Sequence, residues 1–186
     1  MNALDLQLVQ WFHDHRMPAL TILMQLVSDL NGYLAMSIWA ALFAGYLLWK
    51  HRRDWALVAA VAVPGIMVLN ALVKNLVHRP RPDIGDALQH LATDSFPSGH
   101  ASVSAVFYGL VAAYVIANTS SRPSRIAAVT IAIVMIALVG TSRVYLGVHY
   151  PTDVVGAFVE GIAWLAICLA VIRPSRLRKE GELPVS

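Results

Sequence analysis

Long apolar runs recur along the chain and are separated by short polar segments. Five of them approach the length of about 20 residues that a helix needs to cross the hydrocarbon core of a bilayer. They cover residues 32–49, 55–73, 101–117, 126–141 and 154–172. A further apolar segment, residues 18–30, is shorter, and the pattern leaves open whether it crosses the membrane. The chain is therefore expected to be all-α, an integral membrane bundle of helices.

The first residues follow a different pattern, with apolar side chains at helical spacing at Leu4, Leu8, Trp11 and Phe12. Polar side chains occupy the other positions around the turn. This arrangement is typical of an amphipathic helix that lies on the membrane surface. The segment lacks the basic start and the small-residue cleavage site of a signal peptide. We expect residues 1–16 to form an interfacial helix.

The loops indicate how the bundle is oriented in the membrane. Basic side chains concentrate in alternate loops, at residues 50–53, 120–125 and 173–179. The positive-inside rule places these loops in the cytoplasm and the intervening loops on the opposite face. If residues 18–30 cross the membrane, the N-terminus is cytoplasmic too. We expect one membrane domain over residues 1–186, with the helical bundle at 17–173 and a cytoplasmic tail at 174–186.

Composition agrees with the membrane class and excludes others. Hydrophobic residues make up 58% of the chain and charged residues 13%, against about 25% charged in soluble domains. The net charge of +3 is too small, and its cations too clustered, for a nucleic-acid partner. The single cysteine, Cys168, lies in an apolar run and can form no internal disulfide. It is interpreted as a small core residue.

Three polar stretches interrupt this pattern on the non-cytoplasmic side. They read KNLVHRPRP at 74–82, FPSGHAS at 96–102 and SRVYLGVHYPTD at 142–153. Lys74, Arg81 and Arg143 would repel one another there unless an anion lies among them. The arginine fork matches phosphate oxygens and lysine adds a point charge, so the cluster predicts a phosphate site. Arg79 alone is typical of a cation that reaches from a helix end to the lipid headgroups.

The second stretch opens a predicted helix with Ser98, Gly99 and His100. Ser98 is a favoured N-cap residue, and Gly99 permits close approach of the backbone. The free amides at a helix start attract an anion. The pair could also be an ordinary helix cap. His100 favours the functional interpretation, because its imidazole is placed to give a proton to a bound group.

The third stretch places His149 four residues before Asp153, across the start of a helix. A carboxylate bonded to one ring nitrogen fixes the tautomer and leaves the other nitrogen free to attack. Phosphate ester cleavage needs such a nucleophile among fixed positive charges. We expect His149 to be the nucleophile, Asp153 to orient it and His100 to protonate the leaving oxygen. We expect no metal ion and no cofactor, because the cations supply the charge and no HExxH pattern or cysteine cluster is present.

The three stretches resemble the signature motifs of the type 2 phosphatidic acid phosphatase family, which also includes the vanadium haloperoxidases. The family pattern is Lys, six residues, Arg-Pro; then Pro-Ser-Gly-His; then Ser-Arg, five residues, His, three residues, Asp. Its fixed positions are all filled here, by Lys74, Arg81, Pro82, Pro97, Ser98, Gly99, His100, Ser142, Arg143, His149 and Asp153. The resemblance covers roughly residues 70–156 by motif. It implies about six transmembrane helices, with residues 18–30 as one of them, and the catalytic roles given above.

The resemblance also implies a function for so short a chain: a bacterial membrane lipid phosphatase. Such enzymes act on undecaprenyl diphosphate, phosphatidylglycerol phosphate or phosphatidic acid, and undecaprenyl diphosphate is our preferred expectation. The implied location is the bacterial cytoplasmic membrane, with the site on its non-cytoplasmic face. The expected partners are a lipid phosphate and the bilayer, with no nucleic acid and no obligate protein partner.

Other functions stay open on the sequence. One is a phosphotransferase of the same fold that passes the phosphoryl group to a second lipid. Another is a transporter in which His149, Asp153, Glu160 and Lys74 form a relay, and a third is an inactive structural relative. Glu160 itself falls on the same helix face as Asp153, so it is either functional or a structural hydrogen-bond acceptor between helices.

Overall fold

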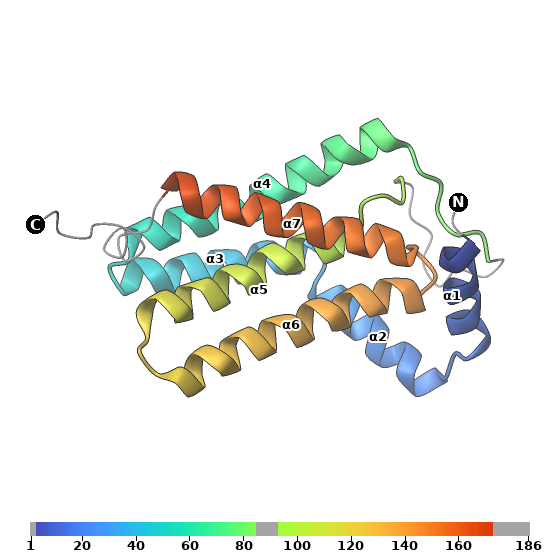
Figure 1. The fold of residues 1–186 in the computed structure, drawn as a ribbon, viewed down its shortest axis with the longest axis horizontal. Helices are drawn as coiled ribbons and strands as arrows, with labels where there is room; N and C mark the ends of the chain where they lie inside the picture. Colours follow the sequence, from blue (N-terminus) through green and yellow to red (C-terminus); the bar gives the residue numbers. More distant parts are fainter. Residues whose placement is uncertain (1–2, 85–92, 173–186) are drawn as a thin grey trace, which may run out of the picture.

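The computed structural model describes residues 3–84 and 93–172, and this part of the chain forms helices without a strand. The helices are α1 (Ala3–Asp14), α2 (Pro18–Leu30), α3 (Tyr33–Trp49), α4 (Arg53–Val77), α5 (Gly99–Asn118), α6 (Arg122–Tyr145) and α7 (Pro151–Ile172). Helices α3 to α7 run lengthwise through the bundle, and α1 lies across one end (Figure 1). The all-α prediction is confirmed. The predicted tail at 174–186 lies outside the described residues.

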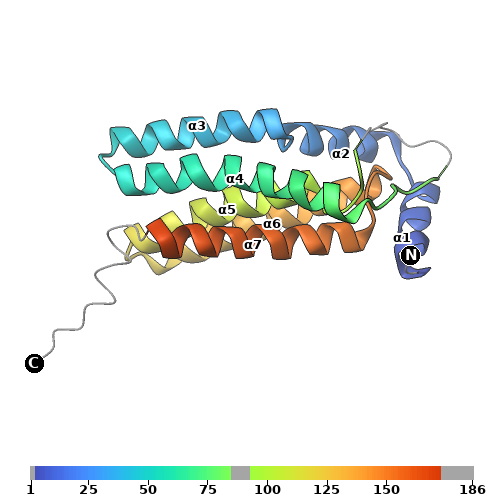
Figure 2. The same ribbon diagram turned by 90° about the horizontal axis from the view of Figure 1, so that it is seen from above.

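The number of membrane spans differs from the expectation of six. Four helices, α4 to α7, are each long and apolar enough to cross a membrane. Helices α2 and α3 meet that test only together, as a pair bent by 54°, and Figure 2 shows one continuing into the other across the bend. The 13 residues of α2 extend only about 20 Å at a rise of 1.5 Å per residue, short of a hydrocarbon core of about 30 Å. Within residues 3–84 and 93–172 the structure therefore supports at most five spans.

The bend between α2 and α3 has a local cause in the pair Asn31 and Gly32. The Asn31 side chain donates to the Val27 carbonyl oxygen at 2.7 Å, which closes the end of α2. Gly32 adopts an extended conformation as the N-cap of α3. The helix therefore stops and restarts within two residues. This break allows α2 to lean toward α6 while α3 packs on α4.

The expectation of a cytoplasmic N-terminus depends on residues 18–30 forming a span of their own, and α2 does not meet the test for a span by itself. Helix α1 lies at the end where α4 finishes and α7 begins (Figure 1). The basic segments at 50–53 and 120–125 lie at the other end (Figure 1). Leu4, Leu8 and Trp11 of α1 are exposed, whereas Asp5 and Val9 are buried. The helix is present, and its placement at the membrane interface stays a prediction.

Helix α5 lies at the centre, in contact with α3, α4, α6 and α7. Its residues Val103, Val106 and Leu110 join a buried cluster with Trp55 of α4 and Met36 of α3. On the α7 side, Gly161 allows a very close approach, because a Cβ at this position would lie 2.8 Å from the Ser102 carbonyl oxygen. The same Cβ would lie 2.9 Å from that of Ala105. The backbones of α5 and α7 are held together by this contact.

Replacing Gly161 with alanine is expected to destabilise the protein by about 1–3 kcal/mol, the usual cost of forcing an extra carbon into a packed interior. Gly45→Ala is the matched control, since nothing lies within 4 Å of a Cβ there. Both substitutions gain similar helix propensity, so the difference isolates the contact with α5. Thermal unfolding in one detergent measures it. Equal melting temperatures for the two variants would contradict the close packing of α5 and α7.

Candidate active site

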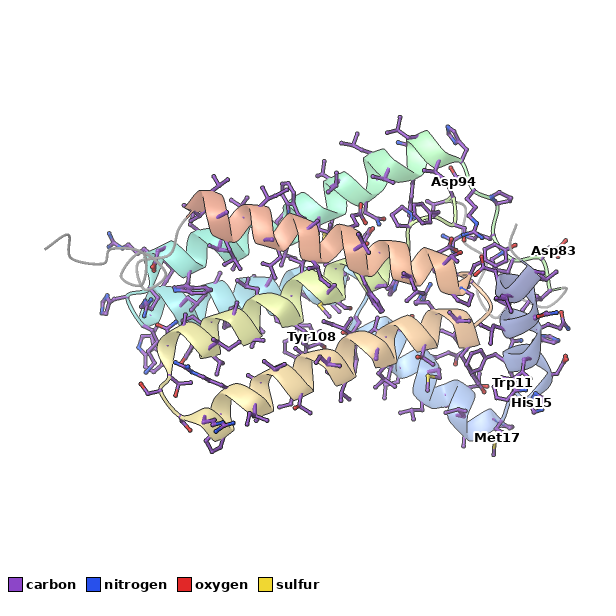
Figure 3. All side chains as sticks on the ribbon, in the orientation of Figure 1. Trp11, His15, Met17, Asp83, Asp94 and Tyr108 are labelled. Atoms are coloured by element: carbon purple, nitrogen blue, oxygen red, sulfur yellow. The ribbon has the colours of Figure 1, made fainter. Side chains whose placement is uncertain are left out.

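The three polar stretches meet at the end of the bundle that α1 covers. The first stretch spans the end of α4, the second leads into the start of α5, and the third joins α6 to α7. Figure 3 shows Asp83 and Asp94 at this end, together with Trp11, His15 and Met17 from the N-terminal segment. Tyr108, by contrast, lies midway along the bundle. All eight predicted site residues belong to this end or to the first turns below it.

His149 lies in the turn between α6 and α7 and is only 2% exposed. Its Nδ1 is 3.5 Å from Asp153 Oδ2, and its Nε2 is 3.3 Å from Nη1 of Arg81. Burial lowers the pKa of the imidazole to about 3; the charges of Arg143 and Arg81 act in the same direction, and Asp153 only partly opposes them. The ring is therefore neutral at pH 7, with one nitrogen toward a carboxylate and the other toward a cation.

Asp153 is fully buried in the first turn of α7 and accepts hydrogen bonds on both oxygens. Its Oδ2 accepts from the Ser95 hydroxyl and, at 2.8 Å, from the Tyr150 amide. Its Oδ1 accepts from Arg79 Nη1 at 2.6 Å. Buried carboxylates require such partners, and here the partners also fix the direction in which the carboxylate faces His149.

Lys74 and Arg81 are both held by backbone carbonyl oxygens of residues 93–95. The Lys74 ammonium donates to the Asp94 carbonyl oxygen at 2.6 Å. Arg81 donates through Nε to Thr93 O at 2.7 Å and through Nη1 to Val148 O at 2.7 Å. Burial lowers the pKa of Arg81, although the charges of Asp153 and Asp94 oppose this. Because carbonyl groups position these cations without cancelling their charge, the site favours an anion.

Arg143 comes from the last turn of α6 and is fully buried. Its guanidinium donates to the Ser28 hydroxyl of α2. The short segment at 18–30 therefore contributes to the site even though it is not a complete span. Nothing in the pattern of residues indicates this contact between Arg143 and Ser28.

Ser98, Gly99 and His100 open α5 as predicted, but with different contacts. Ser98 occupies the N-cap position without a side-chain capping bond, and its buried Oγ has no hydrogen-bond partner in the part of the chain that the structure describes. At Gly99, a Cβ would collide with the Tyr33 hydroxyl. The His100 ring stacks on Tyr33, with centroids 6.3 Å apart, and its Nε2 faces Gly32. Tyr33 and Gly32, at the break between α2 and α3, thus line this part of the site.

Glu160 takes part in a hydrogen-bond network one level below the site. Its Oε2 accepts from Asn70 Nδ2 at 3.0 Å and from the Ser102 hydroxyl at 2.6 Å. Asn70 accepts in turn from the Tyr33 hydroxyl at 2.9 Å. These bonds join α3, α4, α5 and α7 beneath the turn of Ser98. This network agrees with the interpretation of Glu160 as a structural hydrogen-bond acceptor between helices.

Sequence reasoning missed two members of the site, Asp5 and Arg79. Arg79 lies between two carboxylates, 2.8 Å from Asp5 and 2.6 Å from Asp153, rather than extending to headgroups alone. The sequence shows only that Asp5 and Val9 are four residues apart and so lie on one helix face; that this face is buried is a finding of the structure. Among residues 3–84 and 93–172, no group of three or more His, Cys, Asp or Glu side chains could hold a metal ion.

Comparisons with known proteins identify the family to which the chain is related. The model of the PAP2 superfamily matches residues 53–176. Phosphatidylglycerophosphatase B of Bacillus subtilis is 37% identical over 115 residues, which cover 60% of this chain and 56% of that protein. Decaprenylphosphoryl-5-phosphoribose phosphatase of Mycobacterium tuberculosis is 31% identical over 134 residues, covering 66% and 68%.

A solved structure agrees over a longer part of the chain. The transmembrane PAP2-type phosphatidylglycerolphosphate phosphatase from Bacillus subtilis superposes with a TM-score of 0.83 at 27% identity. The match covers 98% of this chain and 87% of that one. Together with the apolar helices α4 to α7, this likeness makes the protein a multi-pass membrane protein. The chain belongs to the PAP2 superfamily.

Proposed function

We propose that the protein hydrolyses a phosphate ester or diphosphate of a membrane lipid through a phosphohistidine intermediate. One observation carries the proposal: buried His149 directs Nδ1 to Asp153, at 3.5 Å, and Nε2 to Arg81, at 3.3 Å. A nucleophile oriented on one side by a carboxylate and facing fixed cations on the other suits phosphoryl transfer.

In the first step, His149 Nε2 attacks phosphorus. The bond from phosphorus to the leaving oxygen breaks, and that oxygen keeps the electron pair and takes a proton from His100. Asp153 remains ionised and stabilises the positive charge that develops on the His149 ring. Lys74, Arg81, Arg143 and the amides near Ser98 and Gly99 stabilise the charge on the equatorial oxygens. These are the roles expected from the sequence.

In the second step, water attacks the phosphohistidine. His100 accepts a proton from this water, the bond between Nε2 and phosphorus breaks, and free phosphate leaves neutral His149. Because the cations supply the charge stabilisation, we expect turnover in the presence of EDTA. Transfer to a second lipid would differ only in the acceptor that replaces water.

The setting of the site in the bundle supports a lipid phosphate as the substrate class. The site lies at one end of the bundle, so a phosphate at the interface can reach it while its lipid tail stays in the bilayer. The similar proteins are named for a glycerolipid phosphate and for a polyprenyl lipid phosphate, which keeps both types as candidates. The basic turns at the opposite end favour a site on the non-cytoplasmic face of a bacterial inner membrane.

Phosphate release by the detergent-purified chain tests the proposal. The substrates are undecaprenyl diphosphate, phosphatidylglycerol phosphate and phosphatidic acid, each in EDTA, with and without an acceptor lipid. We expect release from at least one lipid without acceptor, and none from His149→Ala. The control His51→Asn, at the far end of the bundle, retains activity. If folded wild type releases nothing alone but labels the acceptor, hydrolysis is the wrong reaction; if neither occurs, phosphoryl transfer is wrong.

A further inference from the structure

Helix α1 brings a carboxylate to the site from outside the segment that the family model matches. That segment is residues 53–176, whereas Asp5 lies near the start of the chain. Asp5 is only 3% exposed, although α1 is otherwise amphipathic with exposed leucines. A buried carboxylate needs strong partners, and those of Asp5 all lie next to Asp153.

Arg79 is held on three sides. Its Nη2 donates to Asp5 Oδ2 at 2.8 Å, and its Nη1 donates to Asp153 Oδ1 at 2.6 Å and to Thr152 Oγ1 at 2.8 Å. The guanidinium also lies 4.4 Å from the centroid of the Tyr150 ring. Each end of the fork thus meets a different carboxylate. Arg79 cannot turn without breaking one of these bonds.

Asp5 also stabilises the beginning of α7. Its Oδ1 accepts from the Thr152 amide at 3.1 Å, and its Oδ2 accepts from the Thr152 hydroxyl at 2.5 Å. The first amides of a helix have no partner within it, and negative charge is favourable there. Asp5 therefore fixes both Arg79 and the turn of α7 that carries Asp153.

The charges of Asp5, Arg79 and Asp153 together affect the interaction between Asp153 and His149. A lone arginine bound to Asp153 would neutralise the carboxylate that His149 depends on. With Asp5 present, one guanidinium is shared by two carboxylates, so Asp153 keeps part of its negative charge. Burial by itself would raise the pKa of Asp5, but hydrogen bonds from Thr152 and Arg79 lower it below its usual value. Burial would lower the pKa of Arg79, and Asp5 and Asp153 raise it instead.

We propose that Asp5 is a positioning residue: acting through Arg79, it fixes Asp153 and so the orientation and hydrogen bonding of His149. The inference rests on the proposed phosphatase function, in which His149 is the nucleophile. It assigns to α1 a role in catalysis in addition to any contact with the bilayer. The described contacts of Asp5 do not include His149, so its effect on the ring passes through Arg79, while its bonds to Thr152 hold the first turn of α7.

The first test is kinetic. Asp5→Asn keeps the shape of the side chain and removes its charge, and we expect kcat to fall about 10- to 100-fold, the scale of a small misplacement of a catalytic group. KM stays within about twofold, because substrate binding is unchanged. Asp14→Asn is the matched control: Asp14 lies on the same helix and bonds only to exposed Gln10 in the described contacts. Its kcat equals that of the wild type.

A double-mutant cycle separates positioning from general stability. If Asp5 acts through Arg79, then Asp5→Asn causes no further loss of kcat in an Arg79→Gln background. Losses that multiply would overturn the proposal, as would wild-type kcat in Asp5→Asn. Melting temperatures of all variants show whether each is folded at the assay temperature.

A second measurement does not depend on activity. The ring nitrogen resonances of ¹⁵N-labelled His149, assigned with His149→Gln, report its tautomer and hydrogen bonds. We expect these resonances to shift in Asp5→Asn and to stay unchanged in Asp14→Asn. Unshifted resonances in a folded Asp5→Asn variant would overturn the positioning role even in a protein without phosphatase activity. Shifted resonances in an inactive wild-type chain would instead reject the proposed function alone.

Discussion

Replacing His149 with alanine is expected to lower kcat by about 10⁴-fold or more, the scale seen when one member of a coupled nucleophile and base is removed. The imidazole is buried and neutral at pH 7, with its pKa lowered to about 3 by burial. It therefore offers a lone pair at Nε2, beside Arg81 at 3.3 Å. No other side chain named in the site combines a nitrogen lone pair that faces a cation with a carboxylate that can stabilise the imidazolium formed on attack.

The covalent step can be observed directly. Rapid quenching of the enzyme with ³²P-labelled lipid phosphate should leave label on the wild-type protein, in a bond that is stable in base and lost in acid, as expected for phosphohistidine. His149→Ala should carry no label. His100→Ala should still be labelled, more slowly, because the nucleophile remains. Label of equal amount on His149→Ala would identify a different nucleophile and reject the proposed mechanism.

The apolar pattern predicted the helices well because a bilayer leaves the backbone few choices. Residues 55–73 and 154–172, for example, fall inside α4 and α7, since every backbone group in lipid must be bonded within its own helix. The span count was less predictable. Asn31 and Gly32 indicate a helix break, but whether two apolar segments form one bent crossing or two depends on packing against α4 and α6.

The motif residues could be assigned to one face because each lies at a helix end, and helices alternate in direction across a membrane. The residues that hold these motif residues in place could not be assigned from the sequence. Asp5 was interpreted as part of a polar face toward water, yet that face meets the polar end of the bundle. The contact joins residues 5, 79 and 152, which are far apart in the sequence. Only the folded position of α1 shows that the carboxylate has a buried partner.

The hydrogen-bond partner of Arg143 could not be predicted from the sequence either. Its charge and motif position were evident, but its partner Ser28 lies in α2, a segment interpreted mainly for its length. At Ser98 the structure lacks a contact that the sequence predicts: the side chain does not form the N-cap hydrogen bond. Its buried hydroxyl remains a donor at the start of α5, a use consistent with the proposed phosphate site.

Asp153→Asn should lower kcat by about 10³- to 10⁴-fold, as when a carboxylate that orients a catalytic histidine is replaced by its amide. Both oxygens of Asp153 accept hydrogen bonds, from Ser95, Tyr150 and Arg79. An amide offers one acceptor oxygen and one NH₂ group that only donates, so at least one of these donors would face an NH₂ group. The same NH₂ cannot stabilise an imidazolium on His149 or fix the tautomer with Nε2 free.

The change in stability of Asp153→Asn separates the orientation of His149 by Asp153 from a purely structural role. Removing one partner of a buried ion pair costs about 3–5 kcal/mol when the remaining charge is left alone, but Arg79 keeps its bond to Asp5. We therefore expect a smaller loss of stability beside the large loss of kcat. Asp54→Asn, at the opposite end of the bundle, is the control for activity and should leave kcat unchanged. If folded Asp153→Asn retains kcat within about tenfold of the wild type, His149 needs no carboxylate, and the proposed positioning by Asp5 through Arg79 loses its target.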